Sequence, residues 1–487
     1  MPPGRSRRGV SQNSGLGLYG NGVWRVTELW LVARVECVEF VDRHLGRRLA
    51  DALGSARVVV LHGARQCGKT TLARAVAAER GGTFVTLDDR QMRDAALADP
   101  RTFLRAYAPP LVIDEVQIGG DRLVREIKIA VDEDTRRGRF LLTGSTNFLT
   151  VPTISESLAG RAVILGLWPF SRAELAAASP DAAGRRRGGP RSALSCQRAS
   201  VSGTAAVVER WFEGDVAAAQ TSGAEPDSRP SRDDYLEMVC TGGYPEVQQL
   251  APTGRAEWFD SYVETVISRD IVQIGDIRRA GLLARLLHLA AAGTAGEVNI
   301  ARWSQQLGAD RATIESYLGW LRTVFLMHEL PSWARNRSAR VVRRPKLHLA
   351  DSGLAAAMIG VDAAALRPPT ATATDPLVET FAVGEIARQL SASAGRVTLC
   401  HYRDNARREA DLILERPDGA VVAVEIKATS SPRASDLRHV AALRDGLDRA
   451  EPGAFRAGVL LHTGVHALGF GDRLHSVPLA ALWESAH

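Results

Sequence analysis

The segment Gly63-Ala64-Arg65-Gln66-Cys67-Gly68-Lys69-Thr70 constrains the fold of this 487-residue chain more than any other stretch. It follows the apolar run Val58–Leu61 and precedes an alanine-rich helical pattern from Leu72 to Arg80. A glycine, four residues and then Gly-Lys-Thr between a strand and a helix is the spacing of a phosphate-binding loop, and a chance glycine turn would lack this context. Glycines let backbone N–H groups curl around phosphate oxygens, and the following helix N-terminus favours anions. The segment therefore predicts a nucleoside triphosphate site.

The side chains of this loop have separate expected roles. Lys69 is expected to reach the β- and γ-phosphates as a catalytic residue, and the Thr70 hydroxyl to hold Mg²⁺. Cys67 is expected to pack, with the alternative that its thiol makes nucleotide binding sensitive to oxidation. The expected cofactors are ATP and Mg²⁺, and the expected nucleotide-binding residues are Gly63, Ala64, Arg65, Gln66, Cys67, Gly68, Lys69, Thr70 and Thr71.

Strand and helix patterns alternate after the loop, which predicts an α/β fold with a parallel sheet. The expected strands are 83–87, 110–115, 139–145 and 162–165, and a helix is expected before the loop at 38–53. Asp114 and Glu115 end the second of these strands. We expect Asp114 to bind Mg²⁺ through water and Glu115 to act as general base, against the alternative of two solvated acids at a strand end.

Two further residues are candidates near the γ-phosphate. Ser145, or Thr143 beside it, occupies a strand end suited to sensing this phosphate. Arg161 is expected to face a phosphate of its own chain or of a neighbouring subunit, or else to form a surface salt bridge. Oligomerisation would matter for the second of these roles.

Composition narrows the class of protein. Apolar residues make up 45% and charged residues 24% of the chain, as in ordinary globular proteins, and no apolar run is long enough to span a membrane. The five cysteines are scattered without a CxxC pair, so we expect a cytoplasmic protein with no disulfide framework, no zinc site and no membrane partner. Lysine is rare among the 61 basic residues, so each lysine is a candidate for a place where a compact ammonium is needed: Lys69, Lys128, Lys346 and Lys427.

Composition shifts predict five regions. Residues 1–36 are expected to be a disordered tail, 37–177 the ATPase domain, 178–233 a flexible insertion or linker with one short helix at 205–212, 234–365 a helical, winged-helix-like region and 366–487 a C-terminal α/β domain. The middle region has a helix–turn–helix pattern with Asp310 as the expected N-cap of its second helix. The basic stretch 335–346 follows where a wing would lie. It predicts DNA as a partner, or else a module that serves only for packing.

The C-terminal region holds a second set of candidate residues. Asp375 is expected to cap a helix that carries Glu379 and Glu385. Strands 409–414 and 421–427 are expected to form a hairpin about Pro417-Asp418-Gly419, closed by Arg416 and Ala420, which sets Asp411 opposite Glu425. Alternation then assigns Glu409, Asp411, Glu425 and Lys427 to one face, and to a core face Ala410, Leu412, Leu414, Val422, Val424 and Ile426.

Paired acids on a sheet face predict a metal site. Asp411 and Glu425, completed by Glu379, are expected to bind Mg²⁺ or Mn²⁺. Lys427 would position a water or stabilise a pentavalent phosphate. The alternative is plain charge pairing of Glu409 with Lys427, which leaves Asp411 facing another acid.

The motifs together resemble a prokaryotic family of AAA-type P-loop ATPases fused to a C-terminal domain of unknown function with a restriction-endonuclease-like, PD-(D/E)xK core. The matching stretches are 63–71, 111–117, 141–145, 157–161 with 168–169, 242–246, 269–271, 345–354 and the set Asp411, Glu425 and Lys427. The extra N-terminus and the insertion before residue 233 depart from the family. The resemblance implies ATP binding, ATP hydrolysis and nuclease-type geometry at the C-terminal residues, with nuclease activity left open.

Three hypotheses follow. The first is an AAA-class ATPase that couples its nucleotide cycle to a nuclease-like module acting on DNA. The second is a nucleotide-dependent switch or scaffold for a protein partner, with an inactive C-terminal fold. The third is a metal nuclease whose access ATP regulates.

Overall fold

The computed structural model describes residues 41–144, 158–178, 204–216, 229–271, 280–336, 340, 343–393 and 395–484. The expected N-terminal tail and Ser145 lie outside this part of the chain. Among the described residues, no helix has the length and apolar character needed to cross a membrane.

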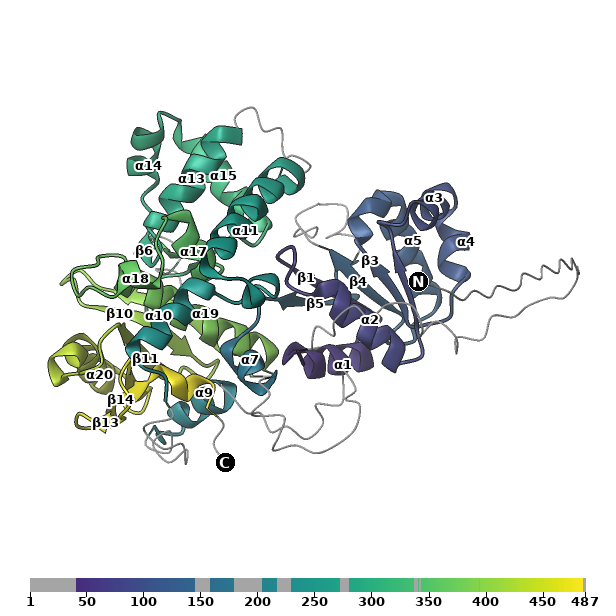
Figure 1. The fold of residues 1–487 in the computed structure, drawn as a ribbon. Helices are drawn as coiled ribbons and strands as arrows, with labels where there is room; N and C mark the ends of the chain where they lie inside the picture. Colours follow the sequence, from purple (N-terminus) through teal and green to yellow (C-terminus); the bar gives the residue numbers. More distant parts are fainter. Residues whose placement is uncertain are drawn as a thin grey trace, which may run out of the picture. The chain divides into compact units, whose positions relative to one another are not determined.

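A five-stranded parallel sheet carries the phosphate-binding loop (Figure 1). Its strand order is β2-β3-β4-β1-β5, so β4 lies between the strand before the loop and the strand that ends at Asp114. The bounds are β1 Val58–Gly63, β2 Thr83–Thr86, β3 Leu111–Asp114, β4 Phe140–Gly144 and β5 Ala162–Leu167. The predicted parallel α/β sheet is confirmed.

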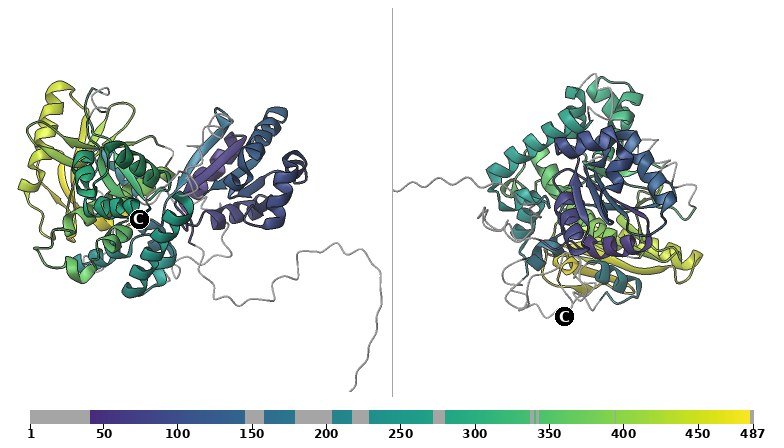
Figure 2. Two further views of the ribbon diagram at one scale, coloured as in Figure 1. Left: turned by 90° about the horizontal axis from the view of Figure 1, so that it is seen from above. Right: turned by 90° about the vertical axis from the view of Figure 1, so that its right-hand side faces the viewer.

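Helices cover both faces of this sheet, as Figure 2 shows from two further sides. Alternate residues of β1 enter two different cores, because Val58 and Val60 pack with α5 whereas Val59 and Leu61 pack with α1 and α2. Burial on both faces explains the continuous apolar runs of these strands. The helices are α1 Leu45–Ser55, α2 Lys69–Glu79, α3 Arg90–Ala98, α4 Pro100–Arg105, α5 Gly120–Glu133 and α7 Arg172–Ala178.

The middle region is helical with a small antiparallel sheet of order β6-β8-β7. Asp310 caps α15 as predicted, because its carboxylate accepts a hydrogen bond from the Thr313 N–H at 2.8 Å. The long helix α11 ends in a π-helical turn, η6. The bounds are α10 Arg232–Thr241, η5 Glu246–Gln249, α11 Pro252–Thr265, η6 Val266–Ile271, α13 Ala280–Ala292, β6 Gly296–Glu297, α14 Ile300–Leu307, α15 Arg311–Thr323, β7 Met327–Leu330, β8 Lys346–Leu349, α17 Ser352–Met358 and α18 Ala363–Leu366.

The C-terminal region has a six-stranded mixed sheet of order β13-β14-β12-β11-β10-β9. Strands β11, β12 and β14 run parallel, whereas the hairpin β10–β11 is antiparallel with Leu412 opposite Val424, the register predicted from the turn. The bounds are α19 Thr374–Ala392, β9 Thr398–Arg403, β10 Glu409–Glu415, β11 Val421–Lys427, η7 Ala434–Leu437, α20 Arg438–Ala450, β12 Phe455–His462, β13 Leu468–Gly469, β14 Leu474–Pro478 and η8 Leu479–Leu482.

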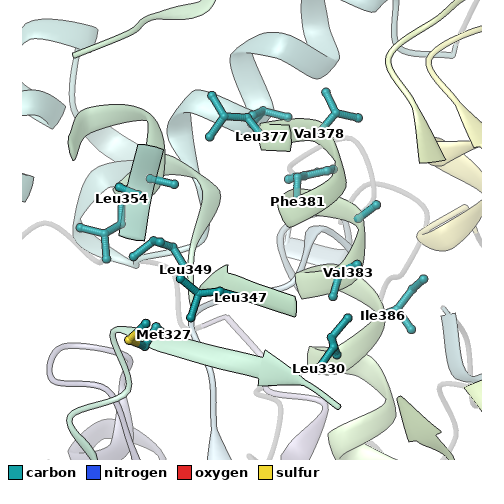
Figure 3. Packing of buried hydrophobic residues seen from close by; sticks show 14 of the residues in the cluster. Met327, Leu330, Leu347, Leu349, Leu354, Leu377, Val378, Phe381, Val383 and Ile386 are labelled. Carbon is teal, nitrogen blue, oxygen red and sulfur yellow. The ribbon is translucent and has the colours of Figure 1, made fainter. Parts of the chain in front are cut away.

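One hydrophobic core joins the middle and C-terminal regions, so the predicted boundary at residue 365 does not separate two cores. Figure 3 shows Met327 and Leu347 of the small sheet and Phe381 of α19 as members of this one cluster. The predicted insertion also contributes, because α9, Thr204–Phe212, buries Trp211 completely in this core. The described part of that insertion is therefore a packed element and not a linker.

Candidate functional site

The phosphate-binding loop has the shape that its glycines predict. Gly63 has φ of 149°, and a Cβ there would lie 2.1 Å from the carbonyl oxygen of Leu167. Gly68, which precedes α2, is left-handed with φ of 94°. Since L-residues with side chains avoid these conformations, both glycines are required by the backbone path and not only by the ligand.

Lys69, Thr70 and Asp114 meet at the carboxyl end of the sheet. The buried Lys69 Nζ donates to the carbonyl oxygens of Gly63 at 3.0 Å and Ala64 at 2.7 Å. The Thr70 hydroxyl donates to Asp114 at 3.0 Å. Thr143, from the intervening strand β4, donates its hydroxyl to the other oxygen of Asp114. The fold thus brings Thr70, which follows β1, to the same place as Asp114 of β3 and Thr143 of β4.

Glu115 leaves the strand in a strained conformation. Its φ of 53° is left-handed, which is uncommon for a residue with a long side chain and occurs preferentially at functional sites. The Gln117 side-chain amide donates to the Glu115 carboxylate. The 3₁₀ helix η1, Val116–Gly119, begins directly after it. The half-buried carboxylate is thereby oriented beside Asp114.

The residues at this end of the sheet fit a magnesium-bound nucleotide. Among the described residues, the hydrogen-bond acceptors of the Lys69 ammonium are backbone carbonyls, so its charge remains available for an anion. Burial, and after it the Lys69 charge, lower the pKa of His62 to about 4, so this imidazole is neutral at pH 7 and leaves Lys69 as the cation at this end of the sheet. The hydroxyl of Thr70 and the carboxylate of Asp114 are hard oxygen donors of the kind that Mg²⁺ prefers.

Arg43 contacts the phosphate-binding loop from outside it, and no sequence motif marks this residue. Its guanidinium donates to the carbonyl oxygens of Cys67 at 2.7 Å and Trp168 at 2.6 Å. It also forms a buried ion pair with Glu174 at 3.0 Å. Cys67 itself is fully buried, with its thiol directed at the Leu167 carbonyl at 3.4 Å, which is the packing role expected for it.

Arg161 is not near the phosphate-binding loop of its own chain. It precedes β5, whose first residue Ala162 pairs with Val58, so it lies at the opposite end of the parallel strands from Lys69. Both arms of its guanidinium bind Asp132, at 2.7 and 2.9 Å. The predicted contact of Arg161 with a phosphate of its own chain is wrong, and the salt-bridge alternative is the one observed.

The C-terminal acids gather around a lysine that was not assigned to them. The Lys346 Nζ lies 2.5 Å from Glu379 and 3.0 Å from Asp411. Asp411 also accepts the Ile426 N–H at 2.9 Å, and Lys427 pairs with Glu425 at 3.0 Å. The rarity of lysine was the one signal that could have drawn Lys346 into this cluster.

Charge is unevenly distributed in the cluster. Burial disfavours the charge of Lys346, but Asp411 and Glu379 outweigh it and raise the pKa of this lysine. Burial, followed by repulsion from Asp411, raises the pKa of Glu379 well above its usual value. The same two causes raise the pKa of Glu425 to about 8. Near neutral pH, Glu379 and Glu425 therefore favour the protonated form, whereas Lys346 stays charged.

The structure differs from the predicted C-terminal site at the metal ligands, at the faces of the hairpin and at the start of α19. The described residues contain no group of three or more His, Cys, Asp or Glu side chains arranged for a metal, and Lys346 lies between two of the proposed ligands instead. Both faces of the hairpin are core, because α20 packs on the face of Ile413 and Ala423. A bulge between Ala410 and Ile413 turns Ala410 toward this helix as well. Asp375 is not a helix cap, since its carboxylate accepts the Ala428 N–H at 3.0 Å.

Helix α19 links this cluster with the ATPase domain. Glu385 accepts the Arg172 N–H at the start of α7 at 2.9 Å. Arg388 donates to the Phe170 carbonyl at 3.1 Å and pairs with the buried Asp351 at 2.8 Å. One helix therefore carries both Glu379 and the contacts to the segment that follows β5.

Three arginines in the described part of the basic stretch 335–346 make contacts within the chain. Arg340 binds Glu415 through both arms, at 2.5 and 2.8 Å, and Arg335 pairs with Glu451 at 2.9 Å. Arg343 donates to the Arg403 carbonyl at 2.9 Å. These contacts favour the packing role over the nucleic-acid role for this stretch.

Comparisons with known families agree with the fold of the first domain. Residues 55–176 match the AAA domain, so this part of the chain is similar to P-loop ATPases. Residues 232–365 and 374–482 match two domains of unknown function, DUF8612 and DUF4143. The predicted combination of an AAA-type ATPase domain with a C-terminal domain of unknown function is confirmed. The endonuclease-like core stays a prediction.

Two mycobacterial proteins are similar to most of the chain. They are the uncharacterized proteins Rv2008c of Mycobacterium tuberculosis (strain ATCC 25618 / H37Rv) and Mb2031c of Mycobacterium bovis (strain ATCC BAA-935 / AF2122/97). Each is 27% identical over 447 residues, covering 92% of this chain and 85% of the relative. Neither name states an activity.

Proposed function

We propose that this chain binds ATP and hydrolyses it as an ATPase of the AAA class. The observation that carries the proposal is the meeting of Lys69, Thr70 and Asp114 beside the strained Glu115. Lys69 would exchange its two carbonyl partners for β- and γ-phosphate oxygens. Glu115 would accept the proton of the attacking water at its carboxylate.

Thr70 and Asp114 would hold the magnesium ion, with Thr143 fixing the second oxygen of Asp114. The bound ion would neutralise charge on the β- and γ-phosphates. Gln117 would keep the Glu115 carboxylate oriented between turnovers.

The rate of phosphate release from ATP tests this proposal. We expect turnover by the wild type, and retention of ATP binding with turnover reduced at least about a hundredfold in Glu115→Gln, as for loss of a general base. Glu126→Gln, on the same domain's helix α5, is the matched control and should turn over normally. Equal turnover by Glu115→Gln and the wild type would remove Glu115 from the mechanism.

We further propose that the C-terminal domain is a regulatory or partner-binding module and not a metal nuclease. Its support is Lys346, whose ammonium takes the place between Glu379 and Asp411 that a cation would need. Helix α19 gives this module a direct route to the ATPase domain. Plasmid and single-stranded DNA should stay intact with Mg²⁺ or Mn²⁺ and any nucleotide. Cleavage that disappears in both Asp411→Ala and Lys427→Ala would restore the nuclease hypothesis.

A further inference from the structure

The phosphate-binding loop contains a second cation, Arg65, which is held by an acid from outside the ATPase domain. Its Nε and Nη2 donate to the two carboxylate oxygens of Asp270 at 2.9 and 2.7 Å. The Asp270 side chain is 4% exposed and that of Arg65 is 34% exposed. Asp270 lies in the π-helical turn η6, about 200 residues further along the chain. Such a bidentate pair fixes both the position and the orientation of the guanidinium.

The same helix also holds the backbone of Arg65. The Tyr262 hydroxyl, from α11, donates to the Arg65 carbonyl at 3.3 Å. Tyr244 in turn donates its hydroxyl to that of Tyr262 at 3.0 Å, and both tyrosines are buried. Side chain and backbone of one loop residue are thus both contacted by the segment 262–270. A change at Arg65 is therefore transmitted directly to α11 and η6.

Arg65 lies within the phosphate-binding loop itself, between Gly63 and Lys69, and its positive charge is favoured there. Burial works against its charge, but Asp270 and then Glu115 raise the pKa of the guanidinium. Arg65 is therefore within electrostatic reach of the general base proposed above. The end of a nucleotide that faces such a base is its terminal phosphate. In the present structure the Arg65 charge is directed to a carboxylate instead.

We propose that Arg65 recognises the γ-phosphate and that Asp270 competes with the nucleotide for it. This inference rests on the proposed ATP binding. A nucleoside triphosphate carries one more phosphate than a diphosphate, so it competes better with the Asp270 carboxylate for the guanidinium. Breaking the pair frees η6, so the helical region responds to ATP more than to ADP. Asp270 is thus a positioning residue, which acts on the nucleotide through Arg65.

Equilibrium binding of ATP and ADP to the full-length chain tests the competition. Asp270→Asn keeps the shape but removes the charge, so it should tighten ATP binding about tenfold, with a smaller effect on ADP. Arg65→Gln should weaken ATP binding about tenfold and bring the ATP and ADP affinities closer together. In the double variant the gain from Asp270→Asn should vanish, because the residue through which it acts is gone.

Asp448→Asn is the matched control, because Asp448 of helix α20 binds Arg473 through both oxygens in the C-terminal region. It should leave both affinities unchanged. Weaker binding of both nucleotides by Asp270→Asn would overturn the proposal, because the Arg65–Asp270 pair would then only stabilise the loop. If Asp270→Asn does not fold, an unchanged preference for ATP in Arg65→Gln overturns it equally. Failure of the folded wild type to bind either nucleotide would instead refute the proposed function.

Discussion

Replacing Lys346 with methionine should destabilise the C-terminal region strongly. The ammonium is buried, with 14% of the side chain exposed, and it contacts Glu379 at 2.5 Å and Asp411 at 3.0 Å. Removing one partner from a buried ion pair costs about 3–5 kcal/mol, since the remaining charge has no compensation. At about 2–4 °C per kcal/mol, the unfolding midpoint should fall by roughly 6–20 °C.

The loss should depend on pH in a defined direction. Lys346 opposes the rise of the Glu379 pKa that burial and Asp411 cause, so without Lys346 the folded-state pKa of Glu379 rises further above its value in the unfolded chain. Stability is then retained at low pH and lost as the pH rises through the folded-state pKa values. The difference in unfolding midpoint between Lys346→Met and the wild type should therefore be larger at about pH 8 than at about pH 5.

Thermal unfolding followed by fluorescence measures both effects, with Lys128→Met as the control lysine on helix α5. That control should change the free energy of unfolding by less than about 0.5 kcal/mol. A Lys346→Met midpoint equal to that of the wild type at every pH would refute the assigned ion pairs. A rise of the wild-type midpoint with Mn²⁺ that is lost in Asp411→Asn would show that the cluster binds a metal after all.

Three further outcomes are expected. Thr143→Val removes the hydroxyl bound to Asp114, so the turnover rate should fall about tenfold with ATP affinity nearly unchanged, as steady-state kinetics would measure. Glu425→Gln removes a carboxyl group whose pKa in the folded protein is raised to about 8. The wild type loses stability as the pH rises from the unfolded-state pKa of this group to about 8, and the variant does not. Unfolding measured against pH should therefore show the variant gaining about 1.4 kcal/mol per pH unit relative to the wild type in this range. Trp211→Ala should cost about 3–5 kcal/mol in denaturant unfolding, because α9 buries this side chain completely in the shared core, whereas a linker residue would cost almost nothing.

The features predicted well from the sequence are those that depend on neighbouring residues. The phosphate-binding loop needs left-handed glycines at fixed offsets, and Gly63 and Gly68 adopt those conformations. The hairpin register follows from its turn, where Gly419 has φ of 87° and the Arg416 N–H donates to the Ala420 carbonyl at 3.0 Å. Such signals are local, so a single sequence is enough to read them.

The features that were missed depend on contacts between distant segments. Lys346, Glu379 and Asp411 come from β8, α19 and β10, and no spacing rule connects these positions. Asp375 has the pattern of a helix cap, yet a hydrogen bond from the Ala428 N–H takes its carboxylate. Ala410 follows the alternation of its strand until a bulge shifts it. In each case the partner or the orientation of the side chain depends on tertiary packing, which the local sequence pattern does not contain.

Binding of ATP to the wild type and to Lys69→Ala, with and without Mg²⁺, tests the central claim most directly. We expect saturable, magnesium-dependent binding of one ATP per chain by the wild type. The affinity of Lys69→Ala for ATP should be at least about tenfold weaker, because the variant lacks the ammonium that would contact the phosphates. Equal ATP affinity of the two folded proteins would contradict the assignment of this loop as the nucleotide site.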